Sequence, residues 1–277
     1  VQRGTLTVGV NDVGHDVKFF GATSGSYLLW DESEDDLLIV PGSANTAGFV
    51  LGHTARVATA NGVNAAAQIQ GIDGSGAALQ IVRWQNDAYG SELHLSKSRG
   101  TTVTAGGALS NNDGIGVITF GANDGDSWHP SAYIKAEADA AHSASEHAAR
   151  IIFNTATGST SPAERVRINS AGNVLIGGTA NHGTTVGVAA ISIFNGTPPA
   201  GTLANGASFF CASGEMKVID AAGNITVLSP HDDDGRWIYH SKNSVTGKVL
   251  HVHMEKLVKK LEEKFGWGFV EEFTEEI

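Results

Sequence analysis

Cysteine is almost absent from this sequence, in which Cys211 is the only one among 277 residues. A single cysteine excludes a disulfide framework within the chain and any zinc or redox motif built on a Cys-x-x-Cys pair. Charged residues are also scarce, at 17% against about 25% in an average soluble protein. No apolar run approaches the ~20 residues that a membrane-spanning helix needs, so we expect no membrane insertion.

Positively charged residues are fewer than negatively charged ones. The chain has 18 Lys and Arg against 29 Asp and Glu, which gives a formal net charge of −11. Binding to the phosphates of nucleic acid or of an anionic bilayer depends on clustered Lys and Arg. The composition therefore predicts that nucleic acid is not a partner.

Motifs for nucleotide binding and nucleophilic catalysis are missing as well. The sequence contains no Gly-x-x-x-x-Gly-Lys-Ser/Thr phosphate loop, no Gly-x-Ser-x-Gly nucleophile elbow and no Cys–His constellation. We therefore predict that the protein is not an enzyme and has no cofactor. Glycoside cleavage remains the alternative, because the paired carboxylates that it requires can lie far apart in a sequence.

Glycine, in contrast, is abundant: its 35 residues are about 13% of the chain, against about 7% in an average protein. Short apolar runs bounded by Gly, Asn, Asp or Ser follow one another up to residue 253, and most are too short for helices. They predict a mostly β chain of serial short-strand modules, of the β-sandwich, β-prism or β-helix kind. The expected strands are Asp16–Gly21, Tyr27–Asp31, Leu37–Val40, Ala67–Ile72, Leu79–Trp84, Leu93–Ser96, Val117–Gly121, Ala132–Ala136 and Arg150–Asn154.

A weak internal repeat supports this prediction. The segment Val166–Val174 returns as Lys217–Ile225, and both have an Ala-Gly-Asn centre between two apolar arms. Because Gly and Asn tolerate a positive φ, this pattern predicts two β-hairpins. The Gly/Ala/Thr/Pro-rich stretch Gly177–Gly206 between them is either part of a solenoid or, as we favour, a loosely packed connector.

The composition changes at Met254, since 11 of the 47 charged residues lie in the last 24 positions. Apolar residues recur there at helical spacing, which predicts an amphipathic helix of about 12 residues. An isolated helix of this length is marginal in water, so its apolar stripe needs a partner. We predict that the stripe serves trimerisation; its residues are Met254, Leu257, Val258, Leu261 and Phe265. A further helical turn or two is expected after the Gly266–Gly268 break, from Phe269, Val270, Phe273 and Ile277.

Together these features divide the chain into four parts. Residues 1–60 form an N-terminal β module, and residues 61–180 form a central β domain. Residues 181–230 are a Gly/Ala-rich connector with a β-hairpin, and residues 231–277 are a C-terminal hairpin with the helix.

Three stretches, in this order, resemble phage tail fibres and related tail-associated receptor-binding proteins. They cover more than half of the chain. The first is Gly9–Gly21, continued by Thr23–Ser33. The second runs from Gln80 to Gly177 and contains Glu-Arg-Val-Arg-Ile at 164–168 and Gly-Asn-Val at 172–174. The third combines Gly214–Val218 and Gly223–Thr226 with the hairpin and helix at Trp237–Leu261.

This resemblance implies an intertwined homotrimer in the phage tail, outside the host cell, that mediates attachment to the host. Its implied partners are other phage tail proteins and a host cell-surface glycan or protein. Physical chemistry agrees with an oligomer, because short strands of small residues bury little core in one chain and can bury more against identical chains. A tailspike-type glycan depolymerase is the alternative function. A bacterial surface adhesin is a third interpretation, and it calls for an anchor or secretion segment.

Histidine supplies one candidate metal site, at His251 and His253. On a strand both imidazoles face the same side, so three chains around an axis could offer six nitrogens to one ion. The favoured interpretation is simpler: a strand whose histidines are exposed, while Leu250 and Val252 face the core. We therefore predict no bound metal.

The receptor contact is expected in the loop Asn123–Pro130, because loops lie at the surface and carry function. Trp128 could stack on a sugar, Asp124 and Asp126 could accept bonds from its hydroxyls, and His129 lies beside them. The alternative for Trp128 is a packing role between neighbouring chains. Trp30, within an apolar run, is assigned to the core.

Overall fold

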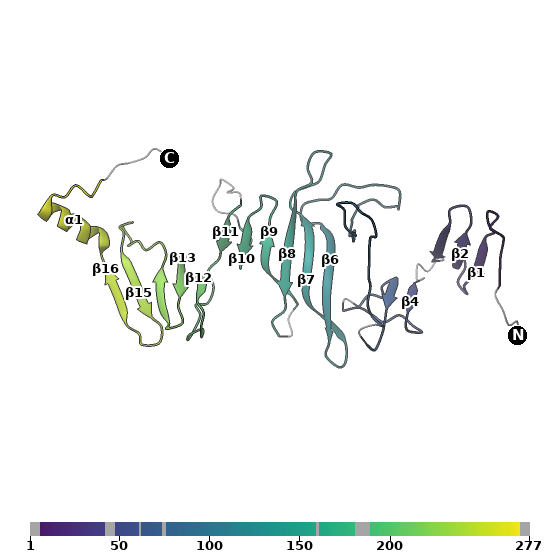
Figure 1. Ribbon diagram of the computed structural model, residues 1–277, viewed down its shortest axis with the longest axis horizontal. Helices are drawn as coiled ribbons and strands as arrows, with labels where there is room; N and C mark the ends of the chain where they lie inside the picture. Colours follow the sequence, from purple (N-terminus) through teal and green to yellow (C-terminus); the bar gives the residue numbers. More distant parts are fainter. Residues whose placement is uncertain are drawn as a thin grey trace. The chain divides into compact units, whose positions relative to one another are not determined.

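The computed structural model describes residues 6–41, 48–60, 62–73, 76–158, 161–180 and 189–271. Within these ranges the chain is mostly β, with four sheets and a single C-terminal helix (Figure 1). The mostly β prediction is therefore confirmed.

The first sheet is an antiparallel meander of β1 (Val17–Phe20), β2 (Tyr27–Asp31) and β3 (Asp36–Val40). Alternation along β2 places Leu29 and Trp30 on opposite faces. Leu29 is buried, with 6% of its surface exposed, whereas Trp30 is 41% exposed. The assignment of Trp30 to the core is thus wrong, because its side of β2 stays open to solvent in the described part of the chain.

A two-stranded parallel sheet follows, made of β4 (Phe49–Leu51) and β5 (Ala67–Ile69). The two strands expected at Leu79–Trp84 and Leu93–Ser96 do not form. Their apolar alternation is typical of strands, but a strand also requires a hydrogen-bonded neighbour, and none of the described residues pairs with them.

The largest sheet has six strands in the order β11-β10-β9-β8-β7-β6. Its buried residues include Ile152 on β8 and Leu175 on β10. The last pairing, of β10 with β11, is parallel. Because β11 lies within the stretch expected to be a loose connector, that expectation is wrong at Ile191–Ile193; residues 181–188 lie outside the described part. The strands are β6 (Gly114–Asn123), β7 (Trp128–Ala138), β8 (Ala149–Thr155), β9 (Ala163–Ile168), β10 (Val174–Ile176) and β11 (Ile191–Ile193).

The fourth sheet is antiparallel throughout and keeps the chain order. The repeat detected in the sequence is confirmed, since β9–β10 and β13–β14 are both antiparallel hairpins. Gly172 and Gly223 occupy equivalent turn positions with φ of 78° and 82°. The strands of the sheet are β12 (Ser208–Ala212), β13 (Glu215–Ile219), β14 (Asn224–Val227), β15 (Tyr239–Asn243) and β16 (Val249–Val252).

The helix α1 spans Met254–Phe265, as the sequence predicts. It ends at Gly266, which adopts a left-handed conformation and donates its N–H to the carbonyl oxygen of Glu262 at 2.8 Å. This is a common way for a helix to stop, because glycine has no Cβ to oppose a positive φ. The further helical turn is wrong for Phe269 and Val270; Phe273 and Ile277 lie outside the described residues.

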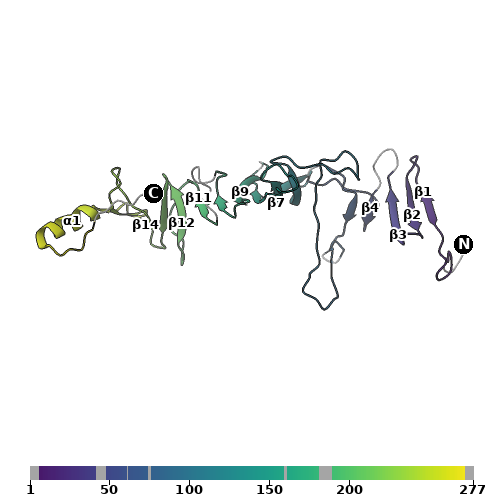
Figure 2. The same cartoon turned by 90° about the horizontal axis from the view of Figure 1, so that it is seen from above.

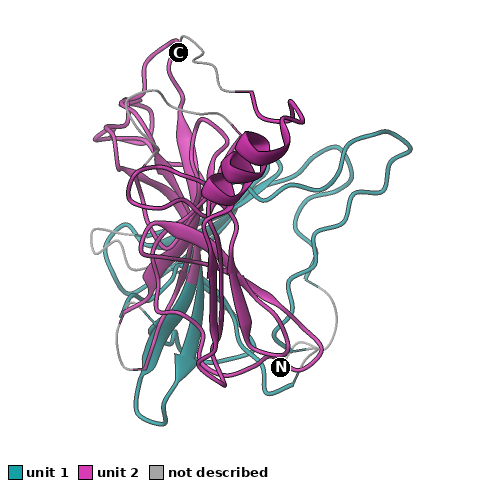
Figure 3. Ribbon diagram, turned by 90° about the vertical axis from the view of Figure 1, so that its left-hand side faces the viewer, with its two compact units in different colours: residues 1–95, 119–132 teal, residues 96–118, 133–277 magenta. Residues whose placement is uncertain are grey.

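The chain divides into two compact units (Figure 3). The first contains residues 1–95 and 119–132, and the second contains residues 96–118 and 133–277. The expected boundaries at 180 and 230 both fall inside sheets: the six-stranded sheet continues to Ile193, and the five-stranded sheet runs from Ser208 to Val252.

Candidate functional site

The predicted receptor loop is the turn between β6 and β7, and its own polar side chains build it. The Oδ1 atom of Asp124 accepts hydrogen bonds from the backbone N–H groups of Asp126, at 3.0 Å, and Ser127, at 2.9 Å. Asn123 accepts one from the N–H of Gly125, whose φ of 104° favours glycine. These side-chain to backbone bonds fix the conformation of the turn.

The second carboxylate oxygen of Asp124 lies 3.0 Å from Nε2 of His129, which also lies 2.9 Å from the Ser127 hydroxyl. Bonds from the N–H groups of Ser127 and Asp126, and then His129, lower the pKa of Asp124 below its ordinary value. Asp124 therefore stays ionised at neutral pH. Oδ1 already accepts two bonds from the turn, whereas Oδ2, which faces His129, keeps lone-pair capacity for one more donor.

Trp128 is the first residue of β7 and is 46% exposed. A Cβ built on Gly121 of β6 would lie 4.0 Å from its indole ring, so the ring rests beside this glycine. Asp126 and His129 are exposed on the same hairpin end. The structure thus brings the four predicted receptor residues together on one accessible turn, and receptor binding by them stays a prediction.

The predicted trimerisation stripe lies along one face of α1. Leu257, Leu261 and Phe265 are exposed in the chain, and Met254 and Val258 are half-buried. No residue of this helix is buried.

Sequence reasoning missed that Trp267 extends this surface. Its ring stacks on Phe265 with centroids 4.6 Å apart and nearly parallel planes. The glycines at 266 and 268 could have predicted this contact. Both take a positive φ and let the chain turn after the helix, which places Trp267 beside Phe265.

The two predicted metal-site histidines lie on the same side, with ring centroids of His251 and His253 4.9 Å apart. The structure adds His240, which is paired with His251 across β15 and β16; their Nδ1 atoms lie 3.3 Å apart. In the described part of the chain, no group of three or more His, Cys, Asp or Glu is arranged to hold a metal ion. Leu250 was expected to face the core but is 52% exposed, because no described residue covers that face of β16.

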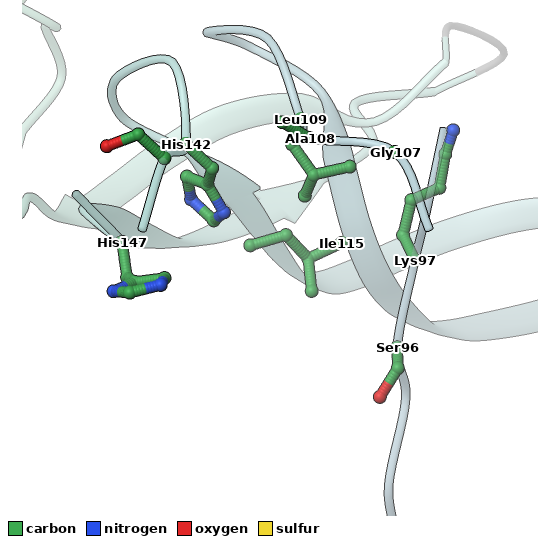
Figure 4. Close-up of a pocket in the computed structure, with 9 residues that line it drawn as sticks. Ser96, Lys97, Gly107, Ala108, Leu109, Ile115, His142 and His147 are labelled. Atoms are coloured by element: carbon green, nitrogen blue, oxygen red, sulfur yellow. The ribbon is translucent and has the colours of Figure 1, made fainter. Parts of the chain in front are cut away.

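One hollow of about 360 Å³ lies in the second unit. Its lining includes His142 and His147, whose rings meet edge to face at 5.9 Å, and Nε2 of His142 lies 3.2 Å from the carbonyl oxygen of Ala148. Figure 4 shows the Lys97 side chain pointing away from these imidazoles. The polar groups of the hollow therefore do not converge on one point.

No helix within the described residues is long and apolar enough to cross a membrane. No protein-family model matches the sequence, and no curated protein matches it. Among solved structures, the chain is similar to the carboxy-terminal domain of the bacteriophage T5 L-shaped tail fibre. The match covers 62% of this chain and 90% of that domain, with a TM-score of 0.36 and 10% sequence identity.

Proposed function

We propose that this protein is a structural subunit of a phage tail fibre that works as a homotrimer and attaches the virion to the host cell surface. It acts in the phage tail, outside the host cell. Its partners are other copies of the chain, other phage tail proteins and a host cell-surface glycan or protein.

The observation that carries the proposal is the exposure of large apolar side chains on the sheets and on the helix. Large apolar side chains are exposed on every sheet that the structure describes and on α1; they include Phe20, Leu37, Phe49, Phe120, Ile191, Phe209 and Leu257. In the described part of the chain, the extensive contacts between elements join strands that are neighbours in the same sheet, and not one sheet to another layer. A sheet becomes stable when at least one face is packed against another layer, so these faces call for other chains.

A trimer around a parallel axis supplies that layer economically. Three copies of α1 can bury Leu257, Leu261 and Phe265 against one another, each stripe covered by the same stripe of its neighbours. The order of the three tail-fibre-like motifs in the sequence supports a phage tail as the place of this assembly.

Attachment by such a trimer needs no catalysis. Three identical sites on one fibre convert weak individual contacts into strong overall binding. The exposed turn with Asp124 and Trp128 offers each chain a charged acceptor and an aromatic ring for a surface sugar.

Two measurements on the purified protein test the proposal. Light scattering should give three times the chain mass of 28.7 kDa, and the protein should bind host cells and compete with phage adsorption. A monomer at micromolar concentration would overturn the trimer. Release of reducing sugar from host polysaccharide would support the depolymerase instead.

A further inference from the structure

The segment Leu79–Leu95 has the side-chain pattern of two strands but no strand partner. Within the described part of the chain, no backbone N–H or carbonyl from Leu79 to Leu95 bonds to another backbone group. Figure 2 draws this part of the chain, after β4 and β5, as a plain trace without arrows. The segment is exposed, so water takes up its backbone donors and acceptors in one chain, and they remain available to a neighbouring strand.

The apolar side chains of the segment alternate with polar ones at its two ends. Leu79 and Ile81 flank Gln80, and Leu93 and Leu95 flank His94. In this chain Leu79 is 72% exposed and Leu93 is 67% exposed. A period of two with one apolar face is the pattern of a half-buried strand, so both ends are built to be covered.

The middle of the segment is an organised loop rather than a flexible linker. The Arg83 guanidinium pairs with the Asp87 carboxylate at 2.5 Å, and the other oxygen of Asp87 accepts the N–H of Tyr89 at 3.0 Å. The same guanidinium lies 5.8 Å from the centre of the Tyr89 ring. The loop between the two arms is therefore held by contacts among its own side chains.

We infer that Leu79–Val82 and Leu93–Leu95 become β-strands by pairing with other copies of this chain. This inference rests on the trimer proposed above and assigns it a second interface, separate from the helix. A free extended segment is a template for strand addition, because its N–H and carbonyl groups are already aligned.

A second copy fits better than an unrelated partner for two reasons. Every chain carries the same unpaired arms, so an assembly of identical chains supplies one arm for each arm that needs one. The arms also contain no Asp, Glu, Lys or Arg. Identical arms therefore approach without the repulsion that opposed like charges cause in a sheet.

Amide hydrogen exchange on the intact protein tests the inference directly, with native mass measured on the same sample. Amides of Leu79–Val82 and Leu93–Leu95 should exchange at least 100-fold more slowly than in an unstructured peptide. A trimer whose arms exchange like a free peptide would overturn the inference and leave the proposed function standing. A monomer would overturn both, whether its arms are protected or not.

Proline substitution gives a second test, because the N–H of Ile81 makes no hydrogen bond to any residue that the structure describes. Ile81→Pro would then be harmless to one chain but would remove a strand bond between chains. We expect it to lower the melting temperature of the trimer or to dissociate it. The matched control is Val103→Pro, at the second position of a turn closed by Ala105 and Thr102, where proline is favoured. If both variants assemble and melt like the parent protein, the inference is wrong.

Discussion

Arg150 and Asp139 are joined through Nη1 and Oδ1 at 2.8 Å, and this pair ties three strands of the six-stranded sheet together. Arg150 belongs to β8 and Asp139 follows the end of β7. The other oxygen of Asp139 accepts the N–H and the hydroxyl of Ser170, in the turn between β9 and β10. Arg150 is only 7% exposed, and its Nη2 also donates to Glu137 and Asn112, both at 2.6 Å.

The first prediction concerns this arginine. Arg150→Met keeps much of the apolar stem but leaves the half-buried Asp139 without its cation and leaves Glu137 with Lys135 alone. Removing one partner of a fully buried ion pair typically costs about 3–5 kcal/mol, and an exposed pair contributes about 0–1 kcal/mol, so we expect a loss between these limits, of about 2–3 kcal/mol. Chemical unfolding at fixed protein concentration measures it.

The control is Arg236→Met, which breaks the more exposed pair of Arg236 with Asp234 in the loop before β15. Exposed pairs contribute about 0–1 kcal/mol, so this variant should unfold almost like the parent protein. If the two variants lost the same free energy of unfolding, the Arg150 cluster would contribute no more to stability than an exposed ion pair.

The second prediction is a loss of stability in acid. Burial by itself raises the pKa of Glu137 and Asp139, but bonds from Lys135 and Arg150 to Glu137, and from Ser170 and Arg150 to Asp139, lower each pKa below its ordinary value. Carboxyls with a lowered folded-state pKa stabilise the fold above the unfolded pKa of about 4, and this contribution is lost as the pH falls through the lower folded values. Melting temperature should therefore be nearly constant from pH 7 to 5 and fall below about pH 4.

Arg150→Met provides the comparison for this pH series. Without the arginine, the pKa of each carboxyl should rise towards its ordinary value. The folded and unfolded states then bind protons almost equally at these groups, so the fall in melting temperature below about pH 4 should be smaller than in the parent protein. An unchanged acid profile in this variant would contradict the role given to the cluster.

The third prediction concerns the helix stripe. Leu257→Asp or Leu261→Asp places an unpaired charge in the proposed seam and should turn the trimer into monomer or aggregate. Lys256→Gln, on the polar face of α1, changes the charge by the same amount and should leave the trimer intact. Light scattering and thermal melting report both effects. If the Asp variants keep their mass and melting temperature, the stripe is simply a solvent-facing surface.

The fourth prediction concerns the receptor turn. Trp128→Ala should abolish adsorption to host cells while the trimer keeps its melting temperature, because a ring used for stacking contributes nothing to the fold. A packing ring would instead show a loss of about 3–5 kcal/mol. Trp84→Ala removes another exposed indole and should leave adsorption unchanged. Normal adsorption by a fully stable Trp128→Ala trimer would remove this turn from the candidate sites.

The fifth prediction uses the two repeated hairpins as an internal comparison. Gly172→Ala and Gly223→Ala both force a side chain into a positive φ, which costs about 1–2 kcal/mol. A Cβ at Gly172 would meet no atom within 4 Å, whereas one at Gly223 would lie 2.9 Å from the Ser244 hydroxyl and from a Val245 methyl. Gly223→Ala should therefore be the more destabilising of the two in a thermal melt. The reverse order would show that the space around these turns differs in solution.

Some features of this protein follow from its sequence because their causes are local. The helix begins and ends at Met254 and Phe265 because helical spacing and the glycine after it act within a few residues. The repeated hairpins form because Gly172 and Gly223 supply the positive φ that their turns need. The turn at Asp124 is equally local, since its side chain bonds backbone groups two and three residues away.

Other features depend on residues that the sequence does not bring together. Arg150 bonds Asn112 across 38 positions, and His240 joins the predicted His251 only through the pairing of β15 and β16. Alternation places Trp30 on one face of its strand, but which face is buried depends on what packs against it. Leu79–Leu95 has the apolar alternation of strands but forms none in the described structure. The reason is that a strand is stabilised by its hydrogen-bonded neighbour and not by its own residues alone.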